Sequence, residues 1–206
     1  MPRVEMFYDI VCPYAYLAST QIEALAARAG AELVWKPFLL GGVFRAIGAP
    51  DRPADTMSAA KQRHNVLDMH RWAEHWDVPL RMPMEHPRRT VLALRALLAV
   101  GEPARARATH ALYRAYWVDG LDVAKADVVR DALDRAGLDG AAGVAAAETP
   151  AIKDALRRLT DEAIARGVFG APAFFVGDEL FWGQDRMQFV ERALRATGTS
   201  GTESGR

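Results

Sequence analysis

Residues 8–17 (Tyr-Asp-Ile-Val-Cys-Pro-Tyr-Ala-Tyr-Leu) constrain the fold of this chain more than any other stretch. Before them, residues 3–8 mix polar and apolar side chains with Val, Phe and Tyr, which is typical of a short strand. After them, apolar residues recur every three to four positions as far as Ala29, which predicts an amphipathic helix. Pro13 stands at the start of that helix, where its missing N–H has no helical partner to lose. Cys12 is therefore expected at the N-cap, between a strand and a helix.

The expected position of Cys12 favours thiolate chemistry. Free backbone N–H groups and the helix dipole both favour negative charge at a helix N-terminus. We therefore expect the pKa of the thiol to lie below its ordinary value of about 8.5. Cys12 is the only cysteine of the chain, so it has no partner for an internal disulfide. The alternative role is that of a small buried hydrophobe, but the strand–Cys–Pro–helix context favours a reactive thiol.

Composition argues against several classes of function. The chain of 206 residues has 26 basic and 26 acidic side chains, so no overall positive field attracts nucleic acid or an anionic membrane. No apolar run approaches the ~20 residues that span a bilayer, and the N-terminus lacks the pattern of a signal peptide. A single cysteine suits a reducing compartment, so we expect a cytoplasmic protein. The histidines have no metal-ligand spacing, and no metal site is expected.

The remaining elements alternate as they do around a helix-flanked sheet. A second strand at 32–38 completes a β–α–β unit, and Pro37 either ends that strand or places it at an edge. Residues 41–53 are interpreted as a loop because of their Gly and Pro content. Helices are predicted at 56–76, 90–100, 103–117, 126–136 and 149–166, strands at 173–176 and 179–182, and a last helix at 186–194.

This order matches a thioredoxin-like α/β fold that is interrupted by an all-helical insertion. We divide the chain into a first thioredoxin-like part at 1–54, a helical insertion domain at 55–145 and a second thioredoxin-like part at 146–196. Residues 197–206 are rich in Gly, Ser and Thr, and they are predicted to form a disordered tail.

A second diagnostic position is Pro172, which directly precedes a predicted strand. In thioredoxin folds the proline at this place is cis and faces the cysteine at the first helix. We therefore predict a cis Ala171–Pro172 bond opposite Cys12, with an ordinary trans loop proline as the alternative. The backbone of Ala171 would then be free to pair with an extended peptide.

Four stretches carry a resemblance to a known family: 8–18, 71–73 with 79–80, 168–172 and 177–186. The chain resembles the glutathione-dependent 2-hydroxychromene-2-carboxylate isomerases, which are relatives of the kappa-class glutathione transferases and of DsbA-type oxidoreductases. The resemblance implies a thioredoxin-like fold with a helical insertion, glutathione as cofactor and a homodimer. It also implies a small aromatic or polyketide-like unsaturated carbonyl compound as substrate.

The resemblance further implies a role for individual residues. Cys12 takes the catalytic position, where the family has a serine whose hydroxyl points at the glutathione sulfur. The backbone of Ala171, before Pro172, would hold the cysteinyl part of glutathione. The other candidates are Asp185 with Gln184 for the γ-glutamyl ammonium, Lys61 for the glycine carboxylate, and Tyr14 and Arg89 for the substrate.

Cys12 is a departure from the family pattern, and it leaves the reaction open. A thiol donates a weaker hydrogen bond than a hydroxyl, and two thiolates within ~4 Å repel each other. Cys-Pro-Tyr also begins the Cys-x-x-Cys motif of thiol–disulfide oxidoreductases, but Ala15 replaces the second cysteine, which excludes an ordinary dithiol oxidase. Three hypotheses remain: a glutathione-dependent isomerase or transferase, a monothiol oxidoreductase that cycles through a glutathione mixed disulfide, and a non-catalytic binding module.

Overall fold

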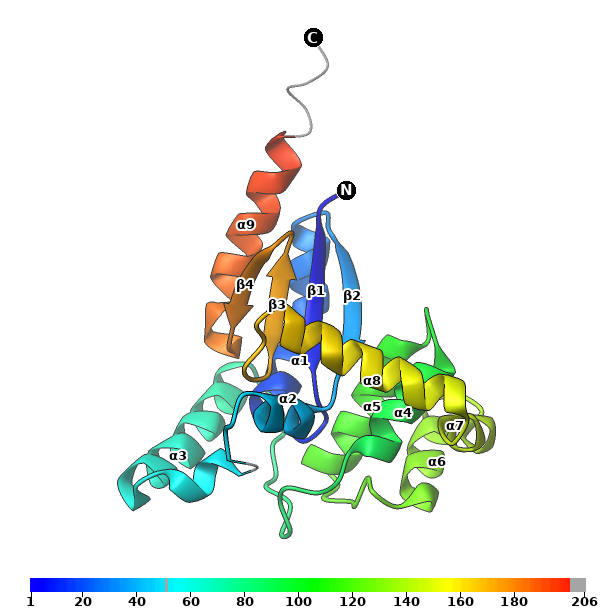
Figure 1. Cartoon of the computed structure of the whole chain (residues 1–206). Coiled ribbons are helices and arrows are strands. Elements are labelled where there is room, and N and C mark those ends of the chain that lie inside the picture. The colour runs from blue at the N-terminus through cyan, green and yellow to red at the C-terminus, as the bar shows by residue number, and fades with distance from the viewer. Residues whose placement is uncertain (51, 201–206) are drawn as a thin grey trace.

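The computed structural model describes residues 1–50 and 52–200, and it has the predicted thioredoxin-like architecture (Figure 1). A four-stranded sheet has the order β2-β1-β3-β4. Its strands are β1 (Arg3–Tyr8), β2 (Glu32–Pro37), β3 (Ala173–Val176) and β4 (Glu179–Trp182). β1 pairs in parallel with β2 and antiparallel with β3, as a β–α–β unit followed by a hairpin requires. Pro37 lies in the edge strand β2, as predicted.

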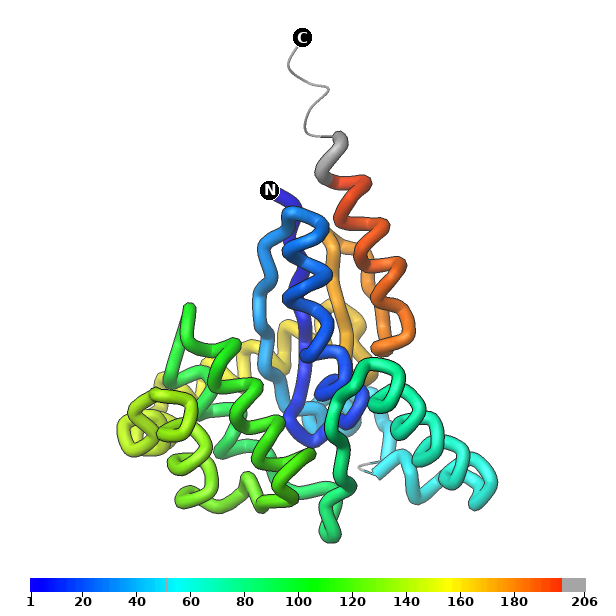
Figure 2. Tube along the Cα trace, turned by 180° about the vertical axis from the view of Figure 1, so that it is seen from behind, coloured from blue at the N-terminus to red at the C-terminus, as the bar shows by residue number. Residues whose placement is uncertain are grey.

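Helices cover both faces of the sheet. α1 (Pro13–Arg28) and α9 (Met187–Ser200) lie on one face, which Figure 2 shows from behind. α8 (Pro150–Ala165) crosses the other face (Figure 1). Just beyond the end of α8, Arg166 forms an ion pair with Glu5 of β1 at 2.5 Å. The central strands are therefore enclosed, and all four residues of β3 are buried.

The inserted helices begin at the end of the sheet where β1 ends. They are α2 (Leu40–Ala46), α3 (Ala59–His75), α4 (Val91–Val100), α5 (Arg105–Trp117), α6 (Ala126–Arg135) and α7 (Gly140–Ala147). Figure 1 places α4 to α7 together on one side and α3 on the other. Buried residues of the sheet and of α4, α5 and α6 form one continuous hydrophobic core. The domain boundaries at 55 and 145 remain a prediction.

Three predictions of local structure were wrong. Residues 41–53 are not all loop, because α2 covers residues 41–46 and the short 3-10 helix η1 (Pro53–Thr56) begins at the last residue of that segment. α7 was not predicted at all, since its Ala- and Gly-rich sequence has little periodicity. α9 continues to Ser200, so residues 197–200 are helical rather than disordered. The predicted tail at 201–206 lies outside the described residues.

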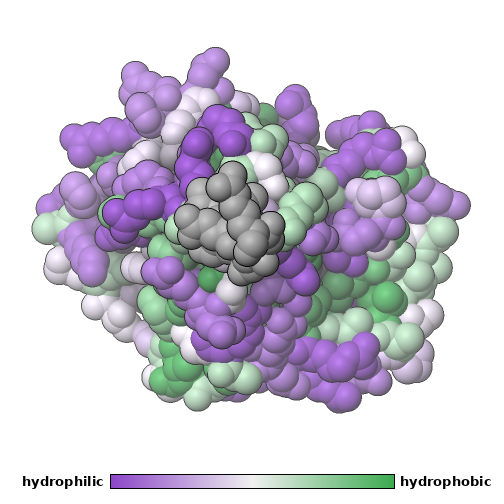
Figure 3. All heavy atoms as spheres, turned by 90° about the horizontal axis from the view of Figure 1, so that it is seen from above, coloured by the Kyte–Doolittle hydropathy of each residue, from purple (hydrophilic) through white to green (hydrophobic). Residues whose placement is uncertain are grey.

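The two ends of the molecule differ in character. The N-terminus and the later turns of α9 lie at one end of the sheet, and the view from above shows mainly hydrophilic side chains there (Figure 3). The opposite end holds the start of α1 and the beginning of the helical insertion (Figure 1). Among the helices of residues 1–50 and 52–200, none is long and apolar enough to cross a membrane.

Candidate functional site

Cys12 occupies the N-cap of α1, as predicted. Its backbone is extended, and Pro13 follows at the first helical position. The Cys12 side chain is only 7% exposed, and its Sγ donates a hydrogen bond to the backbone oxygen of Ala171 at 3.0 Å. The Ala171–Pro172 peptide bond is cis, which confirms the prediction for this bond. The structure thus brings together two segments that are 159 residues apart in the sequence.

The prediction of a depressed pKa for Cys12 was wrong. Burial raises the pKa of the Cys12 thiol to about 12. The N–H groups of Ala15 and Tyr14 act in the opposite direction, although neither makes a regular capping hydrogen bond to the sulfur. The negative charge of Asp9 adds to the rise. Desolvation therefore outweighs the helix N-terminus, and Cys12 is a neutral hydrogen-bond donor at neutral pH.

Tyr14 joins this site from the first turn of α1. Burial raises the pKa of Tyr14 to about 12, and the nearby Asp68, Cys12 and Asp185 act in the same direction. Asp68 belongs to α3 and Asp185 to the 3-10 helix η2 (Gln184–Arg186). The start of α1, the middle of α3 and η2 therefore converge beside Cys12.

A short turn after β4 holds Gln184 and Asp185. The Gly183 N–H donates to the Pro172 carbonyl at 3.0 Å, which joins this turn to the cis-proline loop. Gly183 has φ +100°, a conformation that L side chains rarely adopt, and a Cβ there would lie 2.6 Å from Oδ1 of Asp185. The carboxylate of Asp185 is partly exposed and forms an ion pair with Arg186. The lack of a side chain at Gly183 therefore leaves room for the Asp185 carboxylate.

Two polar groups next to this turn lack partners within the described part of the chain. The Gln184 residue is only 6% exposed, yet its amide makes no hydrogen bond to any described residue. The N–H of Ala171, in a residue that is 8% exposed, likewise has no partner in residues 1–50 and 52–200. Both groups are therefore available to an added ligand, and the Gln184 amide is not fully shielded from solvent.

Two of the predicted site residues belong to the start of α3 and to the stretch just before α4. Lys61 is exposed in the first turn of α3, where its N–H bonds the capping Ser58. Arg89 is exposed just before α4. Neither side chain has a contact with Cys12 among the contacts of the described residues. Their roles therefore stay predictions.

Sequence reasoning missed the buried residues that hold the backbone just before Cys12. Asp9 is fully buried although it carries a carboxylate. Tyr113 and Trp117 of α5 donate hydrogen bonds to the backbone oxygens of Asp9 and Ile10, at 3.3 and 2.8 Å. An acidic residue among apolar neighbours in a buried turn was the one available signal for Asp9. No signal of that kind marks the two α5 residues.

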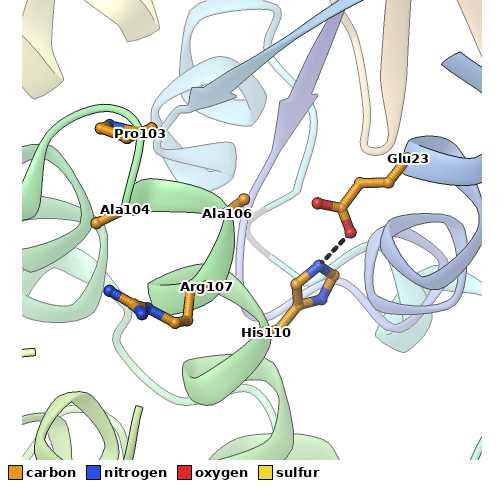
Figure 4. A pocket seen from close by; sticks show the side chains of 6 residues that line it. All are labelled: Glu23, Pro103, Ala104, Ala106, Arg107 and His110. Atoms are coloured by element: carbon orange, nitrogen blue, oxygen red, sulfur yellow. Dashed lines mark hydrogen bonds and ion pairs between the residues drawn. The ribbon is translucent and has the colours of Figure 1, made fainter. Parts of the chain in front are cut away.

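An open depression of about 510 Å³ lies elsewhere on the surface, between α1 and α5 (Figure 4). Its lining includes Glu23 and His110, which form a hydrogen bond at 2.8 Å. None of the predicted site residues lines it. Among the described residues no cluster of His, Cys, Asp and Glu side chains could hold a metal ion.

Comparisons with known proteins agree with the fold and with the resemblance. The model of the DSBA-like thioredoxin domain matches residues 3–195. The 2-hydroxychromene-2-carboxylate isomerase of Sphingobium xenophagum is 30% identical over 191 residues, which are 93% of this chain and 97% of that protein. A solved 2-hydroxychromene-2-carboxylate isomerase structure superposes with a TM-score of 0.86 at 25% identity, covering 99% of this chain and all of the other.

The kappa-class relatives are more distant. Glutathione S-transferase kappa 2 of Caenorhabditis elegans is 27% identical over 207 residues, covering 91% of this chain and 89% of that protein. Isomerases and transferases among the relatives support an enzyme. The chain belongs to the DSBA-like thioredoxin family, in the group that contains the 2-hydroxychromene-2-carboxylate isomerases.

Proposed function

We propose that this protein is a glutathione-dependent isomerase or transferase that acts on an aromatic or polyketide-like unsaturated carbonyl compound. The observation that carries the proposal is the buried, neutral thiol of Cys12 at the N-terminus of α1, with the unpartnered N–H of Ala171 beside it. A neutral donor at this place can do what a serine hydroxyl does. The names of the relatives, isomerases and kappa-class transferases, support the same class of reaction.

The polar groups of the site fit glutathione. The backbone of Ala171, before Pro172, would hold the cysteinyl part through its free N–H. The amide of Gln184 and the carboxylate of Asp185 would bind the γ-glutamyl end, whose ammonium favours a charge-assisted contact. Lys61 is the candidate for the glycine carboxylate.

The residues around Cys12 would favour one negative charge in the site. When bound, glutathione supplies a thiolate nucleophile that can add reversibly to an activated double bond. The N–H groups of Tyr14 and Ala15 favour negative charge at the start of α1. Because burial keeps Cys12 neutral, this side chain brings no second charge. The conflict between two thiolates that the sequence suggested is therefore avoided.

Substrate binding is assigned to Tyr14 and Arg89. The half-buried ring of Tyr14 lies near Cys12 and offers an apolar surface to an aromatic compound. The exposed guanidinium of Arg89 would bind a carboxylate. We also propose that the protein is a cytoplasmic homodimer. Sedimentation at several protein concentrations tests the oligomeric state.

The function is tested with aromatic enones of known geometry, with and without glutathione. Isomerisation that needs glutathione but consumes none supports the isomerase. Loss of the free glutathione thiol in step with the enone identifies a transferase. Turnover of a disulfide reporter instead supports a monothiol oxidoreductase, the second candidate, which rests on the presence of a thiol at the N-cap of α1. Glutathione binding without any turnover identifies a binding module.

Asp185→Asn should weaken glutathione binding by about 1.5–3 kcal/mol, the contribution of a hydrogen bond to a charged group. Isothermal titration calorimetry with reduced glutathione measures the change. Asp178→Asn is the matched control, because it removes one negative charge at the exposed β3–β4 hairpin, away from Cys12. Equal affinity in the Asp185 variant and the wild type would mean that the γ-glutamyl end binds elsewhere.

Gly183→Ala should weaken glutathione binding as well as stability. The new Cβ would displace the Asp185 carboxylate, and a positive φ costs an L residue about 1–2 kcal/mol. Gly177→Ala is the control, since Gly177 has φ +59° but no heavy atom near the added Cβ. Both variants should melt earlier in a thermal scan, and only Gly183→Ala should bind glutathione more weakly. Equal binding by the two variants would contradict a role of Gly183 in placing Asp185.

A further inference from the structure

Asp9 stands out among the residues that the proposed reaction does not use. It is fully buried at the end of β1. Its Oδ2 accepts a hydrogen bond from the Leu40 N–H at 2.9 Å, and its Oδ1 accepts one from the Val11 N–H at 3.2 Å. The hydroxyl of Thr90, next to α4, faces the same carboxylate and lowers its pKa. One side chain thus connects the Cys12 turn, the start of α2 and the start of α4.

Hydrogen bonds to the carbonyl oxygens of Asp9 and Ile10 also hold the backbone of this turn. The Cys12 N–H donates to the Asp9 carbonyl at 3.1 Å, and the Tyr113 hydroxyl donates to that same oxygen at 3.3 Å. Trp117 holds the next carbonyl, that of Ile10. The position of the Cys12 sulfur against Ala171 therefore depends on the turn that Asp9 begins.

The charge of Asp9 also acts on Cys12. Burial raises the pKa of Asp9 to about 6, against the effect of its hydrogen bonds. The titratable groups that face Asp9 are Tyr8 of β1, Cys12, and Tyr113 and Tyr116 of α5. Burial raises the pKa of each of them well above its ordinary value, to about 12 for Cys12 and Tyr116. These groups stay neutral between pH 5 and 8. Within this group, Asp9 is the side chain that changes charge near neutral pH.

We propose that Asp9 is the positioning residue of the Cys12 site. Loss of its proton strengthens the hydrogen bonds that hold the turn at residues 9–12, and it makes the Cys12 thiol harder to ionise. As a carboxylate, Asp9 accepts the N–H groups of Leu40 and Val11 more strongly, because ionised acceptors make the stronger hydrogen bonds. The same negative charge opposes a second one on the sulfur. Above about pH 6 the charge of Asp9 therefore adds to the effect of burial, which already keeps the Cys12 thiol neutral.

The test measures the reactivity of Cys12 from pH 5 to 8 with 4,4′-dipyridyl disulfide. The Cys12 thiolate attacks one sulfur, the disulfide bond breaks, one thiopyridyl half stays on Cys12 and the other leaves as thiopyridone, which is followed by absorbance. Cys12 is the only cysteine, so every event reports on this residue. Neither glutathione nor a substrate is present, so the result does not depend on the proposed reaction.

Asp9→Asn should react faster than wild type above pH 7 and at nearly the same rate at pH 5, where Asp9 of the wild type is mostly protonated. The ratio of the two rates should rise through pH 6 and level off at several-fold, up to about tenfold for one unit of pKa. An effect of the substitution that does not depend on the protonation of Asp9, such as a turn loosened equally at all pH values, would raise the rate at every pH by the same factor. A ratio that is constant with pH therefore overturns the proposal.

A second pair of variants tests the proposal if Asp9→Asn does not fold. Thr90→Val removes the hydroxyl that faces the carboxylate and leaves the charge of Asp9 in place. The pH at which Asp9 ionises should then move upward, and Cys12 should react faster than in wild type near pH 6 to 7. Thr90→Ser keeps the hydroxyl and should behave as wild type. Identical pH profiles for Thr90→Val and Thr90→Ser also overturn the proposal.

Discussion

Replacing Cys12 with serine should preserve glutathione-dependent isomerisation and abolish the covalent glutathione adduct. In the structure the sulfur is a buried neutral donor to the Ala171 carbonyl. A serine hydroxyl keeps that donor and is the stronger of the two. Wild-type protein in oxidised glutathione should gain one glutathionyl group per chain, because Cys12 is the only cysteine. Adduct formation should be slow at neutral pH and about tenfold faster per pH unit, since it requires the thiolate.

Intact mass spectrometry measures the adduct, and the enone assay measures isomerisation. Cys12→Ala is the matched control, because it removes the donor without adding bulk. It should lower the isomerisation rate by up to about tenfold, which corresponds to one hydrogen bond of 0.5–1.5 kcal/mol. Complete loss of activity in Cys12→Ser, together with turnover of a disulfide reporter by the wild type, would contradict the isomerase and support the oxidoreductase. A wild-type Cys12 that never forms the adduct and supports no turnover would favour the binding module.

The elements that carry the fold were predictable because each has a strong local signal. Pro13 and Pro150 mark the first positions of α1 and α8, and Gly177 with Asp178 makes the β3–β4 hairpin. These signals act over a few residues, so they survive without any knowledge of tertiary contacts. The cis bond before Pro172 was predicted differently, from the comparison with thioredoxin folds, in which the proline at this place is cis.

The missed helices depend on contacts that are distant in sequence. α2 begins with Leu40, whose N–H is bound by the Asp9 carboxylate, and a Cβ on Gly42 would lie 2.9 Å from Cγ2 of Thr160. In α7, a Cβ on Gly140 would lie 2.2 Å from the carbonyl oxygen of Arg130. At Gly42 and Gly140, neighbouring elements therefore come too close for a side chain.

The pKa of Cys12 was mispredicted for the same reason. The sequence indicates the helix N-terminus, which favours the thiolate, but burial of the sulfur depends on residues far along the chain. Tyr113 lies close enough for its own pKa to be raised by Cys12. The candidate site was predictable as a pairing of Cys12 with the Pro172 loop, and its protonation state was not.

Trp117→Ala should destabilise the whole protein by about 3–5 kcal/mol, as truncation of a large buried aromatic does. Trp117 is fully buried in α5, stacks on Tyr16 at an interplanar angle of 8° and donates its indole N–H to the Ile10 carbonyl at 2.8 Å. Trp117→Phe is the control. It keeps a ring and should lose about 1 kcal/mol for the hydrogen bond, plus a smaller packing contribution.

Urea unfolding measures this destabilisation with two probes, circular dichroism and the reaction of Cys12 with a thiol reagent. Trp117 lies in the predicted insertion at 55–145, while Cys12 and Tyr16 lie in the predicted thioredoxin-like part. Because buried residues of both parts form one continuous core, both probes should report a single transition at the same urea concentration, lowered equally in Trp117→Ala. A helical transition that moves while the protection of Cys12 stays unchanged would show that the two parts unfold independently. The thioredoxin-like part would then hold the Cys12 turn without help from α5.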